Sequence, residues 1–289
     1  MATDRTEASL SALRAAEILD KATHRGVDVV AVIEPLPLIV PEPTSLLQPL
    51  VISPELTKFV RSQTAKQVEQ AGGKPDDWEI DVEQGRPAKE IAFAADKHFA
   101  SLIILGLGHH GLFDRLIDGD TALEVLRESD TPVLLASKYF SALPRRVIIA
   151  ADFSPESMEA ARVSLPLLSQ DCEIHLAHVR PSVTIFDGSG LWEEEYEKVA
   201  ETQLQTFKET LEAPATMRVE SIVLVGNPAT ALINYANKID ADLIVSGTHG
   251  AGLMRRIFIG SVASGLLRKS ERSLLVVPKP THQQTKRMD

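Results

Sequence analysis

Short apolar runs alternate with amphipathic stretches along the second half of the chain. The apolar runs predict strands at 146–151, 173–179, 218–225, 243–246 and 273–277, and the stretches between them predict helices at 155–168, 192–211, 229–238 and 261–269. Strands that are short and nearly all apolar are typical of a parallel sheet covered on both faces. Because helices separate the strands, the pattern indicates βαβ units and a doubly wound α/β domain.

The first half of the chain repeats this pattern. Gly85-Arg-Pro-Ala falls on Gly226-Asn-Pro-Ala, and from there the segment 85–138 aligns with 226–279 without a gap. Further upstream the offset drifts: Ala31-Val-Ile-Glu-Pro falls on Ala177-His-Val-Arg-Pro, and Asp4 falls on Asp152. A duplication followed by changes in loop length explains the drift.

The duplication predicts two tandem Rossmann-like domains with parallel sheets. Their expected bounds are 1–142 and 143–280, with a linker at 143–145 and a polar tail at 281–289. The Pro-rich stretch 36–49 is expected to be a loop.

The first domain opens differently from the second. Only Met1-Ala-Thr precedes Asp4, whereas Arg145-Arg-Val-Ile-Ile-Ala-Ala precedes Asp152. We therefore expect the first domain to lack most of its opening strand, which leaves either a residual stub in a weakened sheet or a chain that starts upstream of Met1. In both cases the first domain should be the less stable half and a poor site for a nucleotide, because Asp4 has lost the strand that would position it.

A glycine-rich segment follows the fourth strand of the second domain. Gly247-Thr-His-Gly250, nine residues, and then Gly260-Ser261 match the pattern G-x2-G-x9-G-[ST], which arises by chance in a chain of this length with a probability of about 1%. Glycines let the backbone approach a ligand closely, and the helix expected to begin at Ser261 offers free N–H groups to an anion. The segment therefore predicts a polyphosphate site at the carboxyl ends of the strands.

The first domain departs from this pattern at the positions expected to contact the phosphates. At the offset of the ungapped alignment, His109 replaces Gly250 and Asp120 replaces Ser261. A carboxylate at the expected helix start would satisfy the free N–H groups itself and repel a phosphate by roughly a kcal/mol or more. We expect one intact site per chain, in the second domain.

In these motifs the sequence resembles the universal stress protein family in its tandem form. The resemblance rests on Ala150-Ala-Asp152-Phe-Ser, on Leu176-Ala-His-Val179 and on the glycine segment. It implies an ATP site in which Asp152 lies near the ribose and adenine, Val179 lines the adenine pocket, and the glycine segment holds the phosphates. The residues placed in this site are Ala150, Asp152, Val179, Gly247, His249, Gly250, Gly260, Ser261 and Val262.

Simpler interpretations stay open for several of these residues. Asp152 is also suited to capping the first helix, Val179 to an ordinary strand core, and His249 to a loop without a ligand. The glycine segment is also compatible with inherited geometry that binds no nucleotide. The resemblance further implies pairing through the last strands, either between the two domains as an internal pseudo-dimer or with a second chain.

Composition narrows the classes of partner. The 289 residues carry a net charge of −10, which argues against nucleic acid and anionic membrane surfaces. No apolar run reaches the roughly 18–20 residues of a membrane helix, and the N-terminal segment lacks the pattern of a signal peptide. Cys172 is the single cysteine, and it begins an apolar stretch, so a buried, unreactive thiol and a cytoplasmic location are expected.

No catalytic set of residues is apparent, and no residue is assigned a catalytic or metal-binding role. Three functions therefore stay open: an ATP-dependent regulator in the stress response, an interaction scaffold whose nucleotide site is vestigial, and a slow ATPase. The fold alone does not choose among them.

Overall fold

The computed structural model describes residues 1–34, 53–108, 115–180, 182, 191–248 and 259–279. The first copy comprises β1 (Ala2–Thr3), α1 (Glu7–Thr23), β2 (Asp28–Ile33), α2 (Pro54–Ala71), β3 (Glu79–Gln84), α3 (Pro87–Lys97), β4 (Ile103–Gly106), α4 (Arg115–Glu128) and β5 (Val133–Ala136). The second comprises β6 (Arg146–Ala150), α5 (Pro155–Ser164), the 3-10 turn η1 (Leu165–Leu167), β7 (Glu173–Arg180), α6 (Leu191–Leu211), β8 (Arg218–Val225), α7 (Pro228–Lys238), β9 (Leu243–Gly247), α8 (Ser261–Lys269) and β10 (Ser273–Val277). The expected α/β architecture is confirmed, and the loop expected at 36–49 and the tail expected at 281–289 lie outside the described residues.

The predicted elements of the second copy match the structure to within a few residues. The largest difference is the helix expected at 155–168, which ends at Ser164 and continues as the 3-10 turn η1. Pro166 explains the change, because proline has no N–H to donate and its ring crowds the preceding turn.

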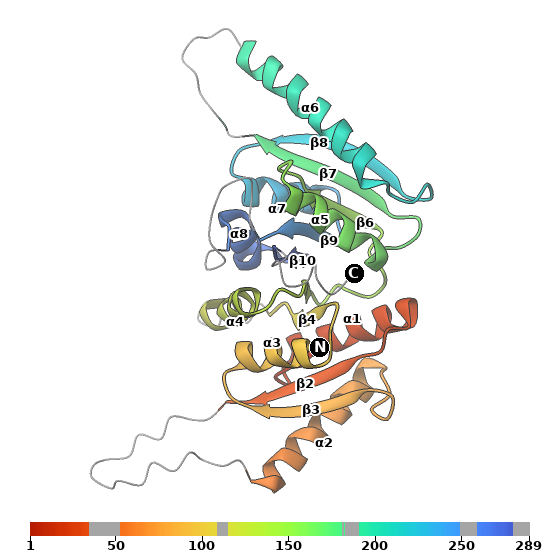
Figure 1. Cartoon of the computed structure of the whole chain (residues 1–289), viewed down its shortest axis with the longest axis vertical. Helices are drawn as coiled ribbons and strands as arrows, with labels where there is room; N and C mark the ends of the chain where they lie inside the picture. Colours follow the sequence, from red (N-terminus) through yellow and green to blue (C-terminus); the bar gives the residue numbers. More distant parts are fainter. Residues whose placement is uncertain (35–52, 109–114, 181, 183–190, 249–258, 280–289) are drawn as a thin grey trace, which may run out of the picture.

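A seven-stranded sheet runs through both copies in the order β4-β5-β10-β9-β6-β7-β8. All neighbours in it are parallel except β5 and β10, which pair antiparallel with Leu134 opposite Leu275. The last strands of the two copies therefore pair with each other, which is the internal pseudo-dimer, and the copies stack along the long axis of the molecule (Figure 1).

Alternating side chains of the strands feed two hydrophobic clusters, one on each face of the sheet. In β6, Val147 and Ile149 face the cluster that includes α1, α5 and α6, whereas Ile148 faces the cluster that includes α3, α4, α7 and α8. Burial on both faces explains why the strands are continuous apolar runs rather than alternating ones.

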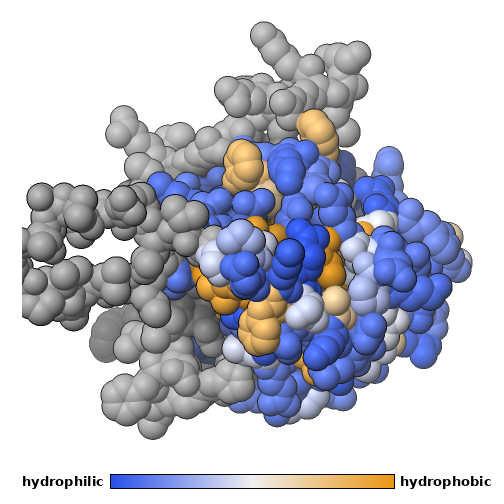
Figure 2. Space-filling view, turned by 90° about the horizontal axis from the view of Figure 1, so that it is seen from below, coloured by the Kyte–Doolittle hydropathy of each residue, from blue (hydrophilic) through white to orange (hydrophobic). Residues whose placement is uncertain are grey.

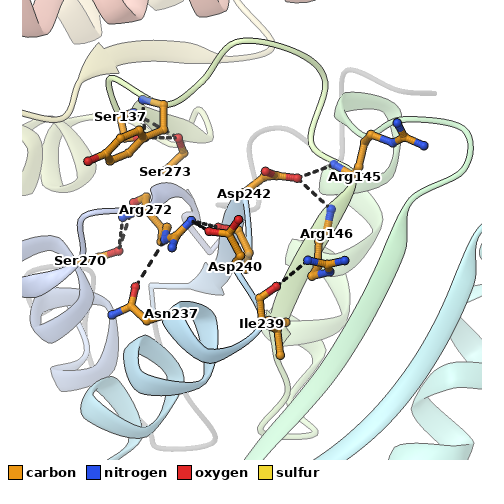
Figure 3. A network of polar contacts seen from close by, with 12 residues as sticks. Ser137, Arg145, Arg146, Asn237, Ile239, Asp240, Asp242, Ser270, Arg272 and Ser273 are labelled. Atoms are coloured by element: carbon orange, nitrogen blue, oxygen red, sulfur yellow. Dashed lines mark hydrogen bonds and ion pairs between the residues drawn. The ribbon is translucent and has the colours of Figure 1, made fainter.

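A polar network fixes the junction between the copies (Figure 3). The Asp242 carboxylate accepts hydrogen bonds from the backbone N–H groups of Arg145 at 2.8 Å and Arg146 at 2.9 Å, which holds the end of the linker at the start of β6. The buried Ser137 N–H donates to the Ser273 hydroxyl at 3.1 Å across the boundary of the copies. The junction is therefore specified by directed bonds as well as by apolar contact.

The opening strand of the first copy, β1, has two residues. The two residues of β1 pair only with β2, whereas β6 pairs with both β7 and β9. The strands of the first copy consequently fall into two sheets: β1, β2 and β3 form a separate three-stranded sheet, and β4 and β5 join the large one.

A cavity of about 630 Å³ lies beside β1. Its lining includes Met1, Val30, Ile91 and Ile104, and the Met1 ammonium at its edge donates to the Asp28 carbonyl oxygen at 2.7 Å. Burial lowers the pKa of this ammonium to about 6. In the second copy the equivalent strands are bridged by the apolar residues of β6.

Strand pairing corrects one part of the sequence alignment. Gly85 donates to the Ile33 carbonyl and Gly226 donates to the Arg180 carbonyl, so Ile33 and Arg180 are equivalent. Aligning Ala31 with Ala177 is therefore wrong by one residue, and Val32 is the counterpart of Val179. The misleading match arose because a Pro follows an Ala by four residues in both segments, at Ala31 and Pro35 and at Ala177 and Pro181.

The outer end of the first copy, seen from below in Figure 2, is mostly hydrophilic with scattered hydrophobic groups. Leu56 and Phe59 of α2 are exposed hydrophobic residues, at 41% and 56%. Among the described residues, no helix combines the length and the apolar character needed to cross a bilayer.

Candidate functional site

The candidate site lies at the carboxyl ends of β6, β7 and β9, beside the start of α8. In a doubly wound sheet this is where strand ends leave a crevice for ligands. The structure places Ala150 at the end of β6, Val179 near the end of β7, Gly247 at the end of β9, and Gly260 and Ser261 at the start of α8. His249 and Gly250 lie outside the described residues.

Asp152 forms the turn that follows β6. Its Oδ1 accepts hydrogen bonds from the Ser154 N–H at 3.1 Å and from the Ser154 hydroxyl. Ser154 in turn caps α5 by accepting from the Ser157 N–H at 3.1 Å. The helix cap is therefore Ser154, and Asp152 orients that cap rather than serving as the cap itself.

The turn also contains a backbone conformation that few side chains adopt. Phe153 has a φ of 65°, in the left-handed region. The first copy repeats the arrangement: Arg5 has a φ of 68°, and Asp4 accepts from the Thr6 N–H at 2.9 Å. Asp4 thus keeps its local turn, to which the Arg5 N–H adds a bond to the Thr3 hydroxyl at 3.1 Å and the Gln67 amide a bond to the Thr6 carbonyl oxygen at 3.0 Å.

Apolar residues of one face form a shelf beside Asp152. Ala150, Val179, Ile259 and Val262 are all partly buried against the same hydrophobic cluster under α7 and α8. Val179 therefore lies at the edge of the core and is partly accessible to solvent. Such a residue can pack inward and still contact a flat apolar ligand.

An aromatic stack on the opposite face was not anticipated from the sequence. The His178 ring lies 4.4 Å from the ring centroid of Phe153 and 6.0 Å from that of Tyr196, stacked with both. His178 Nδ1 is 2.8 Å from the Ala151 carbonyl oxygen, so this nitrogen carries the proton, and Nε2 accepts from the Tyr196 hydroxyl at 2.9 Å. The stack ties α6 to the turn that carries Asp152, and only the aromatic character of all three residues could have signalled it.

The two ends of the glycine segment are joined by a backbone hydrogen bond. Gly260 donates to the carbonyl oxygen of the buried Thr248 at 2.7 Å, and Thr248 donates to Val277 at 3.0 Å. The start of α8 is thereby held against the end of β9, where the segment begins.

The first turn of α8, like that of α3, has no side-chain cap. Thr6, Ser53, Ser154 and Asn227 cap α1, α2, α5 and α7 through their side chains, whereas α8 is preceded by Gly260, which has no side chain to contribute. The first N–H groups of a helix have no acceptor within the helix. The first turn of α8 is thus suited to an anion, and Ser261 is exposed there.

The equivalent place in the first copy is covered. A Cβ added to Gly106, the counterpart of Gly247, would lie 2.2 Å from the carbonyl oxygen of Ala8, because the first turn of α1 packs directly on the end of β4. In addition, α4 begins at Arg115. The expectation that a helix starts at Asp120 is therefore wrong, since Asp120 lies within the second turn of α4.

The single cysteine of the chain is unreactive. Cys172 is fully buried, as expected, and burial raises the pKa of its thiol to about 12. Such a thiol does not form a thiolate near neutral pH.

Comparison with known proteins supports the duplication and the fold. Residues 1–137 and 144–278 each match the universal stress protein family. A universal stress protein of Methanocaldococcus jannaschii is 31% identical over 163 residues, which cover 51% of this chain and 95% of that protein. A universal stress protein structure from Archaeoglobus fulgidus superposes with a TM-score of 0.64 at 23% identity, covering 96% of this chain and 94% of that one. A structure from Pseudomonas aeruginosa gives 0.61 at 15% identity, covering 92% and 87%.

Proposed function

The chain belongs to the universal stress protein family, with two tandem copies of the domain, and we propose that its second copy binds ATP and acts as a nucleotide-dependent regulator in the cytoplasmic stress response. The observation that carries the proposal is the start of α8, where a glycine N-cap leaves the first N–H groups to a ligand. The bond from Gly260 to Thr248 holds these groups beside the end of β9.

In this proposal each part of the site meets one part of the nucleotide. Adenine packs on the apolar shelf that includes Ala150 and Val179, and the Asp152 carboxylate, oriented by Ser154, receives the ribose hydroxyls. The phosphates lie against Gly247, His249, Gly250, Gly260 and Ser261, with Val262 extending the contact into α8. ATP then acts by binding one conformation or one partner complex better than another.

The proposal predicts one nucleotide per chain. In the first copy the backbone of Ala8 lies against Gly106, and the sequence has His109 and Asp120 at the positions of Gly250 and Ser261. The chain therefore combines one binding copy with one copy that supports it through the shared sheet.

Two measurements test the proposal. Mass spectrometry identifies any nucleotide that co-purifies with the protein, and a steady-state assay measures phosphate release. Bound and unhydrolysed ATP supports the regulator, whereas steady release supports a slow ATPase on the same site. Failure to bind ATP, ADP or AMP in calorimetric titration of the folded protein overturns the proposal and favours a scaffold.

Binding should also depend on Ser261. Replacing Ser261 by Asp adds a negative charge at the helix start and should weaken ATP binding, whereas Ser261→Ala should leave the fold intact and lose only what the hydroxyl contributes. Equal affinity of S261D and the parent protein would show that the phosphates lie elsewhere.

A further inference from the structure

Three ionisable side chains meet at the amino ends of β7 and β8, at the opposite edge of the sheet from the proposed ATP site. Glu173 and His175 are two residues apart on β7 and therefore face the same side, and His175 lies directly opposite Glu220 of β8. One ligand atom from each lies within 4.8 Å of the others. Neighbouring strands thus bring a nitrogen and two carboxylate oxygens to one point.

The central residue of this group has an unused polar atom. His175 is 5% exposed, and its Nε2 has no hydrogen-bond partner among the described residues. The nearest carboxylate oxygen, Glu173 Oε1, is 3.6 Å away, which is beyond hydrogen-bond distance. A buried polar atom without a partner destabilises the folded state. A cation bound between His175 Nε2 and the two carboxylates would remove this cost.

We propose that Glu173, His175 and Glu220 bind a divalent transition-metal ion of the zinc class. Imidazole nitrogen together with carboxylate oxygen is a ligand set that suits zinc and its neighbours, and the imidazole disfavours magnesium and calcium. The site is unrelated to the nucleotide, because it lies at the amino ends of the strands.

Tyr235 of α7 places the imidazole for this role. Its hydroxyl is 3.1 Å from His175 Nδ1, and the two rings meet edge to face. When Nδ1–H donates to the hydroxyl oxygen, the lone pair of Nε2 points at the two glutamates. A partner on the second nitrogen is what metal-binding histidines ordinarily have.

A small side-chain movement completes the site. Ligand atoms about 2 Å from a shared ion lie roughly 3–4 Å apart. Glu173 Oε1 and His175 Nε2, at 3.6 Å, already meet this spacing, whereas the three ligand atoms together lie only within 4.8 Å of one another. Both glutamate side chains are long and partly exposed, at 31% for Glu173 and 40% for Glu220, so a change of rotamer is enough to close the distance.

Two arginines balance the carboxylates. Arg146 Nε contacts Glu173 Oε2 at 3.2 Å, which leaves Oε1 toward His175, and the exposed Arg218 pairs with Glu220 Oε1. Arg146 is also held by the Ile239 carbonyl at 2.6 Å (Figure 3). The ion therefore competes with nearby positive charge, so we expect weaker binding than in a zinc site built from cysteines.

A second cluster in the first copy serves as a natural control. Asp28, Glu79 and His98 also come within 4.8 Å of one another. There, however, His98 Nε2 is already bonded to Asp81 at 2.9 Å, and Lys97 bonds the same carboxylate oxygen at 2.9 Å. His98 Nδ1 lies 3.6 Å from Asp28 Oδ2, but the side chain is more exposed than that of His175, at 14% against 7%, and among the described residues His98 contributes no fully buried polar atom without a partner. This group is therefore an ion-pair network that lacks the buried unpaired nitrogen of the His175 cluster.

The test is a titration of the full chain with Co²⁺ and with Zn²⁺ in the absence of nucleotide. Absorption of bound Co²⁺ reports imidazole and carboxylate ligation, and equilibrium dialysis with elemental analysis gives the number of Zn²⁺ ions per chain. We expect one ion per chain. His175→Gln and Glu220→Gln should each lower affinity by tenfold or more, and Tyr235→Phe should lower it by about 10- to 100-fold.

His98→Gln is the matched control and should bind the metal as the parent does. Circular dichroism and thermal melting without metal show whether each variant is folded. A parent protein that binds neither ion, or affinity that survives in both H175Q and E220Q, overturns the proposal. Loss of affinity in H98Q alone would place the ion in the other cluster and overturn it as well.

Discussion

Replacing Gly260 by Asp should separate ATP binding from folding. Gly260 has φ −56° and ψ 154°, a conformation open to every residue, so the substitution introduces no backbone strain. Asp is among the best N-caps, and its charge interacts favourably with the helix dipole, so α8 should be stabilised by a few tenths of a kcal/mol up to about 1 kcal/mol.

The same carboxylate should prevent binding. It occupies the N–H groups proposed to hold the phosphates. About 5 Å from a phosphate, at an effective dielectric constant of about 20, it raises the free energy of the complex by about 3 kcal/mol. Affinity for ATP should therefore fall by about two orders of magnitude.

Isothermal titration calorimetry and thermal melting are the assays. We expect G260D to melt at or slightly above the temperature of the parent protein while it loses ATP binding. Gly260→Asn caps the helix without charge and should lie between the two in affinity. Ser53→Asp adds the same charge at the N-cap of α2 and should bind like the parent. Parental affinity in G260D would refute the assignment of the phosphates to α8.

Three further predictions concern stoichiometry and the first copy. Calorimetry should give one ATP per chain, and two equivalent sites would contradict the assignment of the site to the second copy alone. Adding Arg-Val-Ile ahead of Met1, copied from the start of β6, should fill the cavity and bury two apolar side chains worth about 1.5–3 kcal/mol each. Slower hydrogen exchange in β2 and a higher melting temperature would show this stabilisation. In the parent protein, the first copy should exchange its amide hydrogens before the second. Although burial alone raises it, hydrogen bonds from Lys97 and His98 lower the pKa of Asp81 below its usual value of 3.8. Its contribution to stability is present above pH 3.8 and is lost as the pH falls through the lowered value, so Asp81→Asn should flatten the acid limb of a stability–pH curve.

Local patterns determined most of the elements in the second copy. Apolar runs of strand length, the Ser154-Pro155 helix start and the Gly260-Ser261 helix start are each signals of a few consecutive residues, and β8, α8 and β10 have the predicted bounds. The duplication was likewise readable, since it requires only that one half be compared with the other. The turn around Asp152 recurs at Asp4 because the hydrogen bonds of its carboxylate join residues no more than a few positions apart.

Contacts between distant segments decided the rest. The approach of Ala8 to Gly106 depends on how α1 settles over β4, and the stack of Phe153, His178 and Tyr196 joins three elements. The cluster of Glu173, His175 and Glu220 exists because the register of β7 and β8 sets His175 opposite Glu220. Spacing along a chain determines what a segment can form by itself, whereas register and packing between segments determine which side chains meet, and they depend on the summed burial of the whole core.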